Sequence, residues 1–245
     1  MTDITAVPDY LKSALSHLDE AREAHLTNAR RMGETTTAIS QVQSQKNELE
    51  QENGNDSGAW RAAFRAGGAV ITDELKQRHI ARVARRELAL ECDNMAEVLS
   101  FELDNLKGDC DRSARAYRQA HHGVLSQYAE HELDAALRES CGALVRAMKL
   151  SILVKENPLA NTIGHQGYVE PEHAVMHKVK TWLEQAVRGC NIRLTDEPVL
   201  FKTGLSSSTL PHMDHDVAAT PVQRKVWQEK MREREADLKA RGLLS

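Results

Sequence analysis

Histidines and carboxylates with the spacing of metal ligands occur twice in the last third of the chain. His173 and His177 are one helical turn apart, and the segment HMDHD adds His212, Asp214, His215 and Asp216. Imidazoles at positions i and i+4 can bind one transition-metal ion. The first segment reads HAVMH rather than HExxH, and no cysteine pair lies near it. The pattern therefore favours polar surface at a helix entry and in a loop, and we predict neither a metal nor a cofactor.

Arginines are concentrated in the segment KQRHIARVARRE. This segment places Arg78, Arg82 and Arg85 on one flank of a helix, where they could bind phosphates or an acidic protein surface. A second set could extend the flank: Arg112, Arg115 and Arg118. The alternative is a solvated helix face on which these cations pair with Glu74, Glu87 and Glu91. We favour ion pairing over nucleic-acid binding, and an acidic protein partner fits as well as a phosphate.

Catalytic motifs are missing from the sequence. The chain contains no GxSxG, GxxxxGK[ST] or GxGxxG, and GLSSS has no assigned histidine or aspartate partner. The three tryptophans lie on or near helical apolar stripes, as packing anchors do: Trp60, Trp182 and Trp227. We therefore do not expect an enzyme.

Composition limits the protein class. Of the 245 residues 28% are charged and only 4% aromatic, a balance that fits long, solvent-exposed helices with thin apolar seams. The net charge of −4 gives no argument for a nucleic-acid or membrane partner. The four cysteines form no CxxC pair, and no apolar run opens the chain. We expect a reduced cytosolic protein without signal peptide, transmembrane span or disulfides.

Residues 9–157 contain no proline, and the segment is rich in helix-forming residues. We predict helices over residues 9–52, 57–66, 72–107 and 109–156, with a break at Gly54–Gly58 and a turn at Gly108. Thr72 is placed to cap the third of these helices. Leu11, Leu15 and Leu18 form one stripe, a seam for another helix. The predicted fold is mainly α, an elongated hairpin or bundle of long helices over residues 1–157.

A smaller, proline-containing helical region should occupy residues 158–245. We predict helices over residues 171–188 and 221–241. Gly189 is placed to end the first, and Thr220 begins a T-P-x-Q capping pattern at the second. Between them Ile192 and Leu194 alternate as in a small hairpin, although Pro198 argues against strands. This region is expected to serve as a docking end.

Several stretches of the sequence resemble one protein family. They are ELKQRHIARVARREL, AYRQAHHGVLSQYAEHEL, SILVKENPLANTIGHQGYV, TGLSSSTLPHMD, TPVQRKVWQ and LKARGLLS, with PDYLKSAL near the start. Together they cover essentially the full length. The chain is thereby similar to the capsid size-determination (Sid) proteins of satellite bacteriophages.

The resemblance implies a function. Proteins of this family are helical external scaffolds that form a cage over a helper phage's procapsid. They bridge hexamers of its major capsid protein and direct assembly of a smaller icosahedral shell. The implied partners are that capsid protein and further copies of the chain, with dimer and trimer contacts. The implied location is the host bacterial cytoplasm, on the outer surface of the procapsid, and the scaffold is absent from the mature virion.

Candidate contact residues follow from that expectation. The capsid contact is expected at Arg78, Arg82 and Arg85 or at the loop with His212, Asp214 and His215. Self-association is expected at Leu11, Leu15, Leu18, Trp227 and Met231. Two alternatives stay open: an antagonist of Rho-dependent transcription termination that resembles the polarity-suppression proteins of the same satellites, and a capsid decoration protein.

Overall fold

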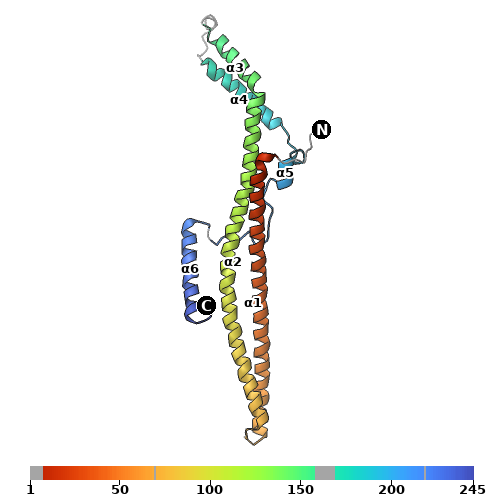
Figure 1. Ribbon diagram of the computed structural model, residues 1–245, viewed down its shortest axis with the longest axis vertical. Helices are drawn as coiled ribbons and strands as arrows, with labels where there is room; N and C mark the ends of the chain where they lie inside the picture. Colours follow the sequence, from red (N-terminus) through yellow and green to blue (C-terminus); the bar gives the residue numbers. More distant parts are fainter. Residues whose placement is uncertain (1–7, 69, 158–168, 218) are drawn as a thin grey trace. The chain divides into compact units, whose positions relative to one another are not determined.

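A computed structural model describes residues 8–68, 70–157, 169–217 and 219–245, and all regular secondary structure in these ranges is helical (Figure 1). The 3-10 turn η1 (Asp9–Leu11) leads into the first helix, and a second turn, η3 (Leu194–Asp196), lies near the end. The α-helices are α1 (Lys12–Ala66), α2 (Asp73–Ser140), α3 (Gly142–Lys155), α4 (Pro171–Gly189), α5 (Pro198–Thr203) and α6 (Pro221–Ala240). The predicted fold class, long helices paired as a hairpin with a smaller C-terminal helical region, is confirmed. No helix in these ranges is long and apolar enough to cross a membrane.

The predicted break at Gly54–Gly58 is wrong, because α1 continues through it to Ala66. The predicted helices 9–52 and 57–66 are thus parts of one helix of 55 residues, about 80 Å long at 1.5 Å per residue. Contacts with α2 explain the continuity: Arg85 of α2 forms ion pairs with Glu52 and Asp56, on either side of Gly54. Tertiary contacts of this kind override the weak helix propensity of glycine.

The predicted turn at Gly108 is also wrong. Helix α2 runs from Asp73 to Ser140 and so joins the predicted helix 72–107 to most of the helix 109–156. Thr72 does accept a hydrogen bond from the Leu75 amide (3.3 Å), which confirms the predicted start. The helical run is interrupted instead at Cys141, and α3 begins at Gly142, a poor helix former.

Start and stop signals in the C-terminal region are confirmed where they can be examined. Pro171 begins α4 and Gly189 ends it. Thr220 and Gln223 form the predicted capping box of α6. The small hairpin near Ile192 is wrong: η3 and α5 occupy this segment, and Pro198 is the first residue of α5. Pro158, where the C-terminal region was predicted to begin, lies outside the described residues.

The chain forms two compact units, each assembled from separate segments. Unit 1 contains Met1–Leu18 and Gln119–Ser208, and unit 2 contains Asp19–Arg118 and Thr209–Ser245. Both units combine segments from before and after residue 157. The prediction that residues 1–157 form the long-helix region and residues 158–245 a docking region stays a prediction.

In unit 2, α1 and α2 lie side by side and antiparallel (Figure 1). Met32 of α1 packs with Leu106 and Cys110 of α2, all three buried. A second cluster joins Phe101 of α2 to Met231 and Leu238 of α6. Unit 2 is therefore a helical hairpin whose α2 also holds the last helix.

In unit 1, the far end of α2 holds two segments that are distant in sequence. Tyr10 stacks on His131 with ring centroids 3.9 Å apart. The Tyr128 hydroxyl donates a hydrogen bond to Glu197, and His121 Nε2 lies 3.1 Å from the Thr203 carbonyl oxygen. These contacts fix both η1 and the η3–α5 segment on α2. Helices α3 and α4 pack on each other, with Val175 of α4 buried.

Candidate capsid-contact and self-association surfaces

The arginine flank of α2 divides into residues with different roles. Arg78 forms an ion pair with Glu74 on its own helix (2.9 Å), so the predicted solvated pairing is confirmed for this residue. The Arg82 guanidinium lies over the Trp60 ring, 5.7 Å from its centroid, and hydrogen-bonds to His79. Arg78 is the most accessible of the three, whereas Arg82 has one face covered.

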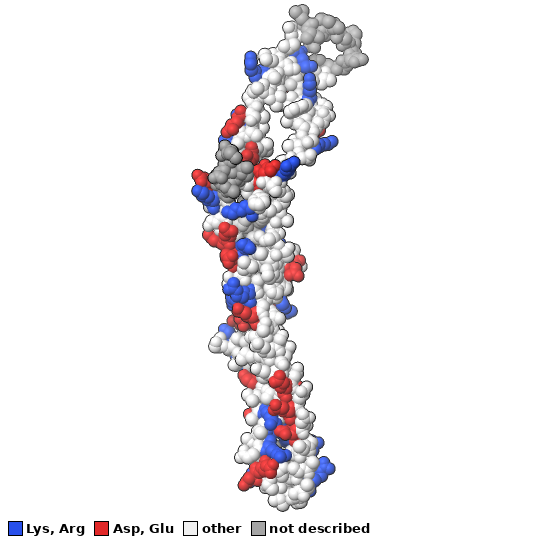
Figure 2. All heavy atoms as spheres, turned by 90° about the vertical axis from the view of Figure 1, so that its right-hand side faces the viewer, with Lys and Arg blue, Asp and Glu red and all other residues white. Residues whose placement is uncertain are grey.

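Arg85 belongs to the hairpin rather than to the surface. Its guanidinium binds Glu52 (3.1 Å) and Asp56 of α1, and the side chain is only 27% exposed. The hydrogen bond and charge of Asp56 raise the pKa of Arg85. Figure 2 shows how charged side chains gather in short clusters of alternating sign over the drawn face. Arg85 therefore connects α1 to α2, and its removal would disturb the fold as well as any contact.

Trp60 is a packing anchor, as predicted. Its indole nitrogen donates to the Leu75 carbonyl oxygen (3.1 Å), which lies in the first turn of α2. Its ring stacks on Phe64, with centroids 5.4 Å apart. Trp60 thus connects the end of α1 to the start of α2, and the Arg82 guanidinium covers one face of its ring.

The second candidate for the capsid contact is the loop of residues 209–217 in unit 2. Leu210 and Met213 are buried, while Asp214 is exposed. The rings of His212 and His215 stack in near-parallel planes, 5.8 Å apart. Nε2 of His215 is buried and has no hydrogen-bond partner within the described residues. This loop carries an exposed carboxylate beside an imidazole nitrogen whose hydrogen-bonding capacity is unused.

Two side chains from the helical hairpin hold this loop. His25 of α1 is fully buried, and its Nε2 donates to the Pro211 carbonyl oxygen (2.9 Å) because a carbonyl oxygen only accepts. Arg118 of α2 donates to the Met213 carbonyl oxygen, also at 2.9 Å. The loop is thus fastened through its backbone on either side of His212, which has a positive φ of 58°.

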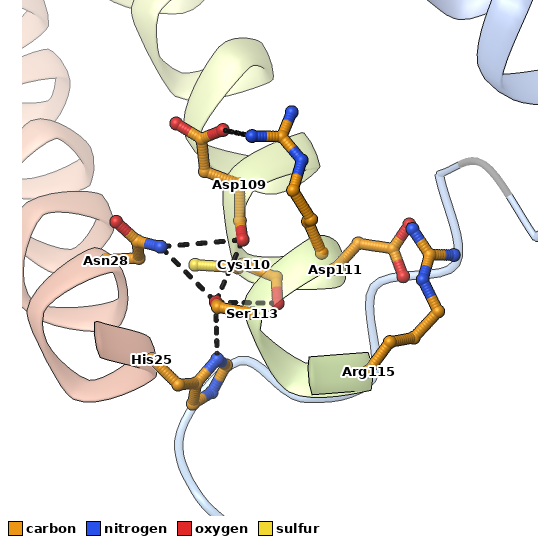
Figure 3. Close-up of polar contacts among 8 residues, drawn as sticks. His25, Asn28, Asp109, Cys110, Asp111, Ser113 and Arg115 are labelled. Carbon is orange, nitrogen blue, oxygen red and sulfur yellow. Dashed lines mark hydrogen bonds and ion pairs between the residues drawn. The ribbon is translucent and has the colours of Figure 1, made fainter. Parts of the chain in front are cut away.

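His25 also contacts a cluster of polar groups from α1 and α2 (Figure 3). Nδ1 of His25 is 2.9 Å from the Ser113 hydroxyl, which donates to the Asp109 carbonyl oxygen (2.8 Å). Asn28, one turn from His25, donates to the same hydroxyl (3.3 Å). Asp111 forms an ion pair with Arg115 at 3.0 Å. The i, i+3 spacing of His25 and Asn28 signals a shared helix face, but nothing in the sequence signals the partner Ser113.

The residues predicted for self-association lie inside the packing of the chain itself. Leu11, Leu15 and Leu18 are buried, as a helix seam should be. Met231 is buried against Phe101, and the Trp227 ring rests on Gly108. The chain itself covers the three leucines and Met231, which are not available as surface contacts in this conformation, and it covers part of Trp227.

Ion pairs that sequence reasoning missed fix α6 on α2. Arg234 binds Asp104 (2.6 Å) and Ser100 (3.2 Å), and Arg241 binds Glu97 through both guanidinium nitrogens. This hydrogen bond from Arg241 holds the pKa of Glu97 below its usual range. Charges are so frequent in both helices that their spacing alone does not identify these pairs.

The metal-ligand spacings do not come together as a site. Within the described ranges no three histidine, cysteine or acidic side chains are grouped so that they could hold a metal ion. His173 and His177 lie on α4 in unit 1, whereas His212 and His215 lie in the loop of unit 2. The four cysteines are free thiols. The histidines of α4 and those of the loop therefore do not form one site in the described ranges.

Comparison with known proteins identifies the family. No family model matches the chain. Glycoprotein 3 of Enterobacteria phage P4 is 64% identical over 245 residues, covering all of both chains. A solved chain of the satellite phage P4 procapsid including the size determination (Sid) protein has the same identity and a TM-score of 0.80. The alignment of structures covers 96% of this chain and all of the other. The chain therefore belongs to the family of satellite-phage size determination (Sid) proteins.

Proposed function

We propose that this chain is an external capsid scaffold of a satellite phage and directs a helper phage's major capsid protein to assemble a smaller shell. The observation that carries the proposal is the full-length relationship to a size determination protein in a procapsid. Such a role is structural and needs no active site. Long helices with exposed charged faces suit it, because a scaffold must span several capsid subunits and still detach.

The partner we propose is the helper's major capsid protein, on the outer surface of the procapsid. Arg78 and Arg82 project from one helix face and suit acidic side chains or backbone carbonyl groups. The loop offers the opposite chemistry through Asp214 and the unpaired Nε2 of His215. We retain Arg78, Arg82, His212, Asp214 and His215 as capsid-contact candidates and assign Arg85 to the fold.

Copies of the chain would also have to bind one another to form a closed cage, which requires contacts about symmetry axes. We propose both dimer and trimer contacts, with the scaffold shed before the virion matures. In the conformation described, the residues predicted for self-association support these contacts indirectly, because they pack inside the two units. They are Leu11, Leu15, Leu18, Trp227 and Met231. The interface itself must use side chains that the monomer leaves exposed.

Co-expression tests the proposal. Helper capsid protein and its internal scaffold are produced with and without this chain, and shell diameters are measured by electron microscopy. We expect a smaller shell covered by an external cage when the chain is present. Equal diameters in the two preparations would refute the scaffold function.

A pair of variants then tests the capsid contact. Arg78→Glu with Arg82→Glu should give shells of the larger size, because two attractive contacts become repulsive. Lys225→Glu with Arg232→Glu is the matched control: both cations are exposed on α6, and the net charge changes equally. Helicity measured by circular dichroism should be the same in both. If the first pair still gives small shells, the arginine flank does not touch the capsid protein.

A further inference from the structure

We propose that an acidic stripe at the end of α2 in one copy of the chain binds a basic stripe on α3 of a second copy. The acidic stripe consists of Glu130, Leu133, Asp134 and Leu137, and the basic stripe consists of Arg146, Lys149, Leu150 and Leu153. The inference rests on the proposed function, in which copies assemble into a cage, and names the surfaces that join them.

The acidic stripe is a single exposed helix face in unit 1. Its members follow the spacing i, i+3, i+4 and i+7, which places them in one row along a helix. Leu133 is 61% exposed and Leu137 is 54% exposed. No ion pair to Glu130 or Asp134 occurs in the described ranges. Two large apolar side chains and two unpaired carboxylates therefore share a face that the chain itself leaves open.

The basic stripe has the same spacing and the opposite charge. Leu150 is 53% exposed and Leu153 is 52% exposed. Arg146 and Lys149 have no ion-pair partner among the residues placed by the structure, and α3 contains no acidic residue. The half-buried side chains of α3 lie on another face, at Leu144, Met148 and Ile152. Packing on α4 therefore leaves the basic stripe free.

The two stripes match at two of their four positions in either direction, and a leucine faces a charge at the other two. Side by side and parallel, they place Glu130 opposite Arg146 and Leu137 opposite Leu153. In the antiparallel direction they place Leu133 opposite Leu150 and Asp134 opposite Lys149. A contact of this kind buries exposed leucines while it pairs charges that have no partner within one copy. Because every copy carries both halves, a second copy is the occupant that this chemistry fits.

The position of the stripes decides the symmetry of the contact. Leu137 and Arg146 are nine positions apart, about two and a half turns at 3.6 residues per turn. Cys141, between the helices, keeps right-handed helical angles (φ −88°, ψ −3°). Across this interruption the acidic stripe of α2 and the basic stripe of α3 face in roughly opposite directions, and we infer that one partner does not cover both. Each copy thus binds two neighbours head to tail, an arrangement that closes into a ring or extends as a chain.

Charge swapping in the full-length chain tests this contact. One variant carries Glu130→Lys and Asp134→Lys, a second carries Arg146→Glu and Lys149→Glu, and a third carries all four changes. Matched controls on α6 are Glu229→Lys with Glu233→Lys and Lys225→Glu with Arg232→Glu, all exposed. Self-association of the purified chains is measured by sedimentation velocity over a range of concentrations. Shell diameter after co-expression is the second readout.

We expect each two-residue stripe variant to self-associate at least about tenfold more weakly than the wild type, because like charges then face each other. The four-residue variant should regain the wild-type association, since the signs are opposite again, and the α6 controls should not change it. Unchanged association in both stripe variants, no recovery in the four-residue variant, or a wild type that stays monomeric would each overturn the inference.

The two readouts separate this inference from the proposed function. If the wild type and all stripe variants give small shells with unchanged association, the stripes are not the contact but the scaffold function stands. If the wild type leaves the shell diameter unchanged, the scaffold function fails, while sedimentation still decides whether the stripes join copies.

Discussion

The indole ring of Trp227 lies directly against Gly108: a β-carbon at position 108 would lie 2.7 Å from Cζ2 of that ring. Gly108 is inside α2, where glycine costs about 1 kcal/mol relative to alanine. The close approach of α6 explains why a residue so unfavourable for a helix is suitable here. The contact also brings Met231 and Leu238 onto Phe101.

Gly108→Ala should separate α6 from α2. The added methyl group meets the ring rather than the end of a flexible side chain, so we expect a loss of about 1–3 kcal/mol in the free energy of unfolding. Urea denaturation followed by tryptophan fluorescence measures the loss, and limited proteolysis should show earlier cleavage in α6. Gly123→Ala is the control, because nothing lies within 4 Å of a β-carbon there. It should stabilise α2 by about 0.5–1 kcal/mol. Equal effects of the two changes would contradict the steric explanation.

His25→Ala should release the loop of residues 209–217. The change leaves the Pro211 carbonyl oxygen without its donor and opens a space beside Ser113. We expect a loss of about 1–3 kcal/mol and faster hydrogen exchange at the Leu210 amide, which donates to Met213 Sδ within the loop. His17→Ala, at an exposed position of α1, should change stability by less than about 0.5 kcal/mol. If the loop amides exchanged hydrogen at the wild-type rate in His25→Ala, His25 would not be the residue that holds the loop in place.

Arg85→Ala should destabilise the α1–α2 hairpin more than Arg78→Ala does. Arg85 joins the two helices through Glu52 and Asp56, whereas the ion pair of Arg78 stays within α2. Thermal unfolding of both variants at low and high salt measures the difference. Salt screens exposed ion pairs, so the difference should shrink at high ionic strength. A larger loss for Arg78→Ala would show that the flank is organised differently.

Unit 1 should lose stability at alkaline pH through Tyr128. Burial, followed by the hydrogen bond and charge of Glu197, raises the pKa of the Tyr128 hydroxyl above its ordinary value of 10.0. The unfolded chain therefore loses this proton first, and the stabilisation, complete below pH about 10, falls as the pH rises further. Denaturation at pH 8 to 11 should show this slope in the wild type and a smaller slope in Tyr128→Phe. Ultraviolet titration should show that the variant lacks one late-ionising tyrosine, whereas Tyr10, whose pKa is also raised by burial, is present in both proteins.

Local signals in the sequence predicted where most helices begin and where they are apolar. Thr72, Pro171, Thr220 and Gly189 act through their own backbone neighbourhood, so their roles could be inferred without a fold. The buried stripe of Leu11, Leu15 and Leu18 follows from helical periodicity in the same way.

Contacts between distant segments could not be predicted. Gly54 and Gly108 resemble helix breaks in the sequence, but both lie inside helices that are in contact with the distant residues Arg85 and Trp227. The sequence predicts Met231 and Trp227 as self-association residues, because their packing against α2 depends on residues more than a hundred positions away. Arg78, Arg82 and Arg85 all lie on α2, but the different roles of Arg78 and Arg85 depend on α1.

Helix α6, which covers Phe101, is synthesised after α2, the helix that carries this residue. Translation produces Phe101 early, whereas Met231 and Leu238, which pack on it, come from the last helix. A nascent chain therefore exposes this ring until the ribosome has made α6. Unit 2 reaches its packed form only in chains translated through α6, so unfinished chains lack the surface that the finished protein presents.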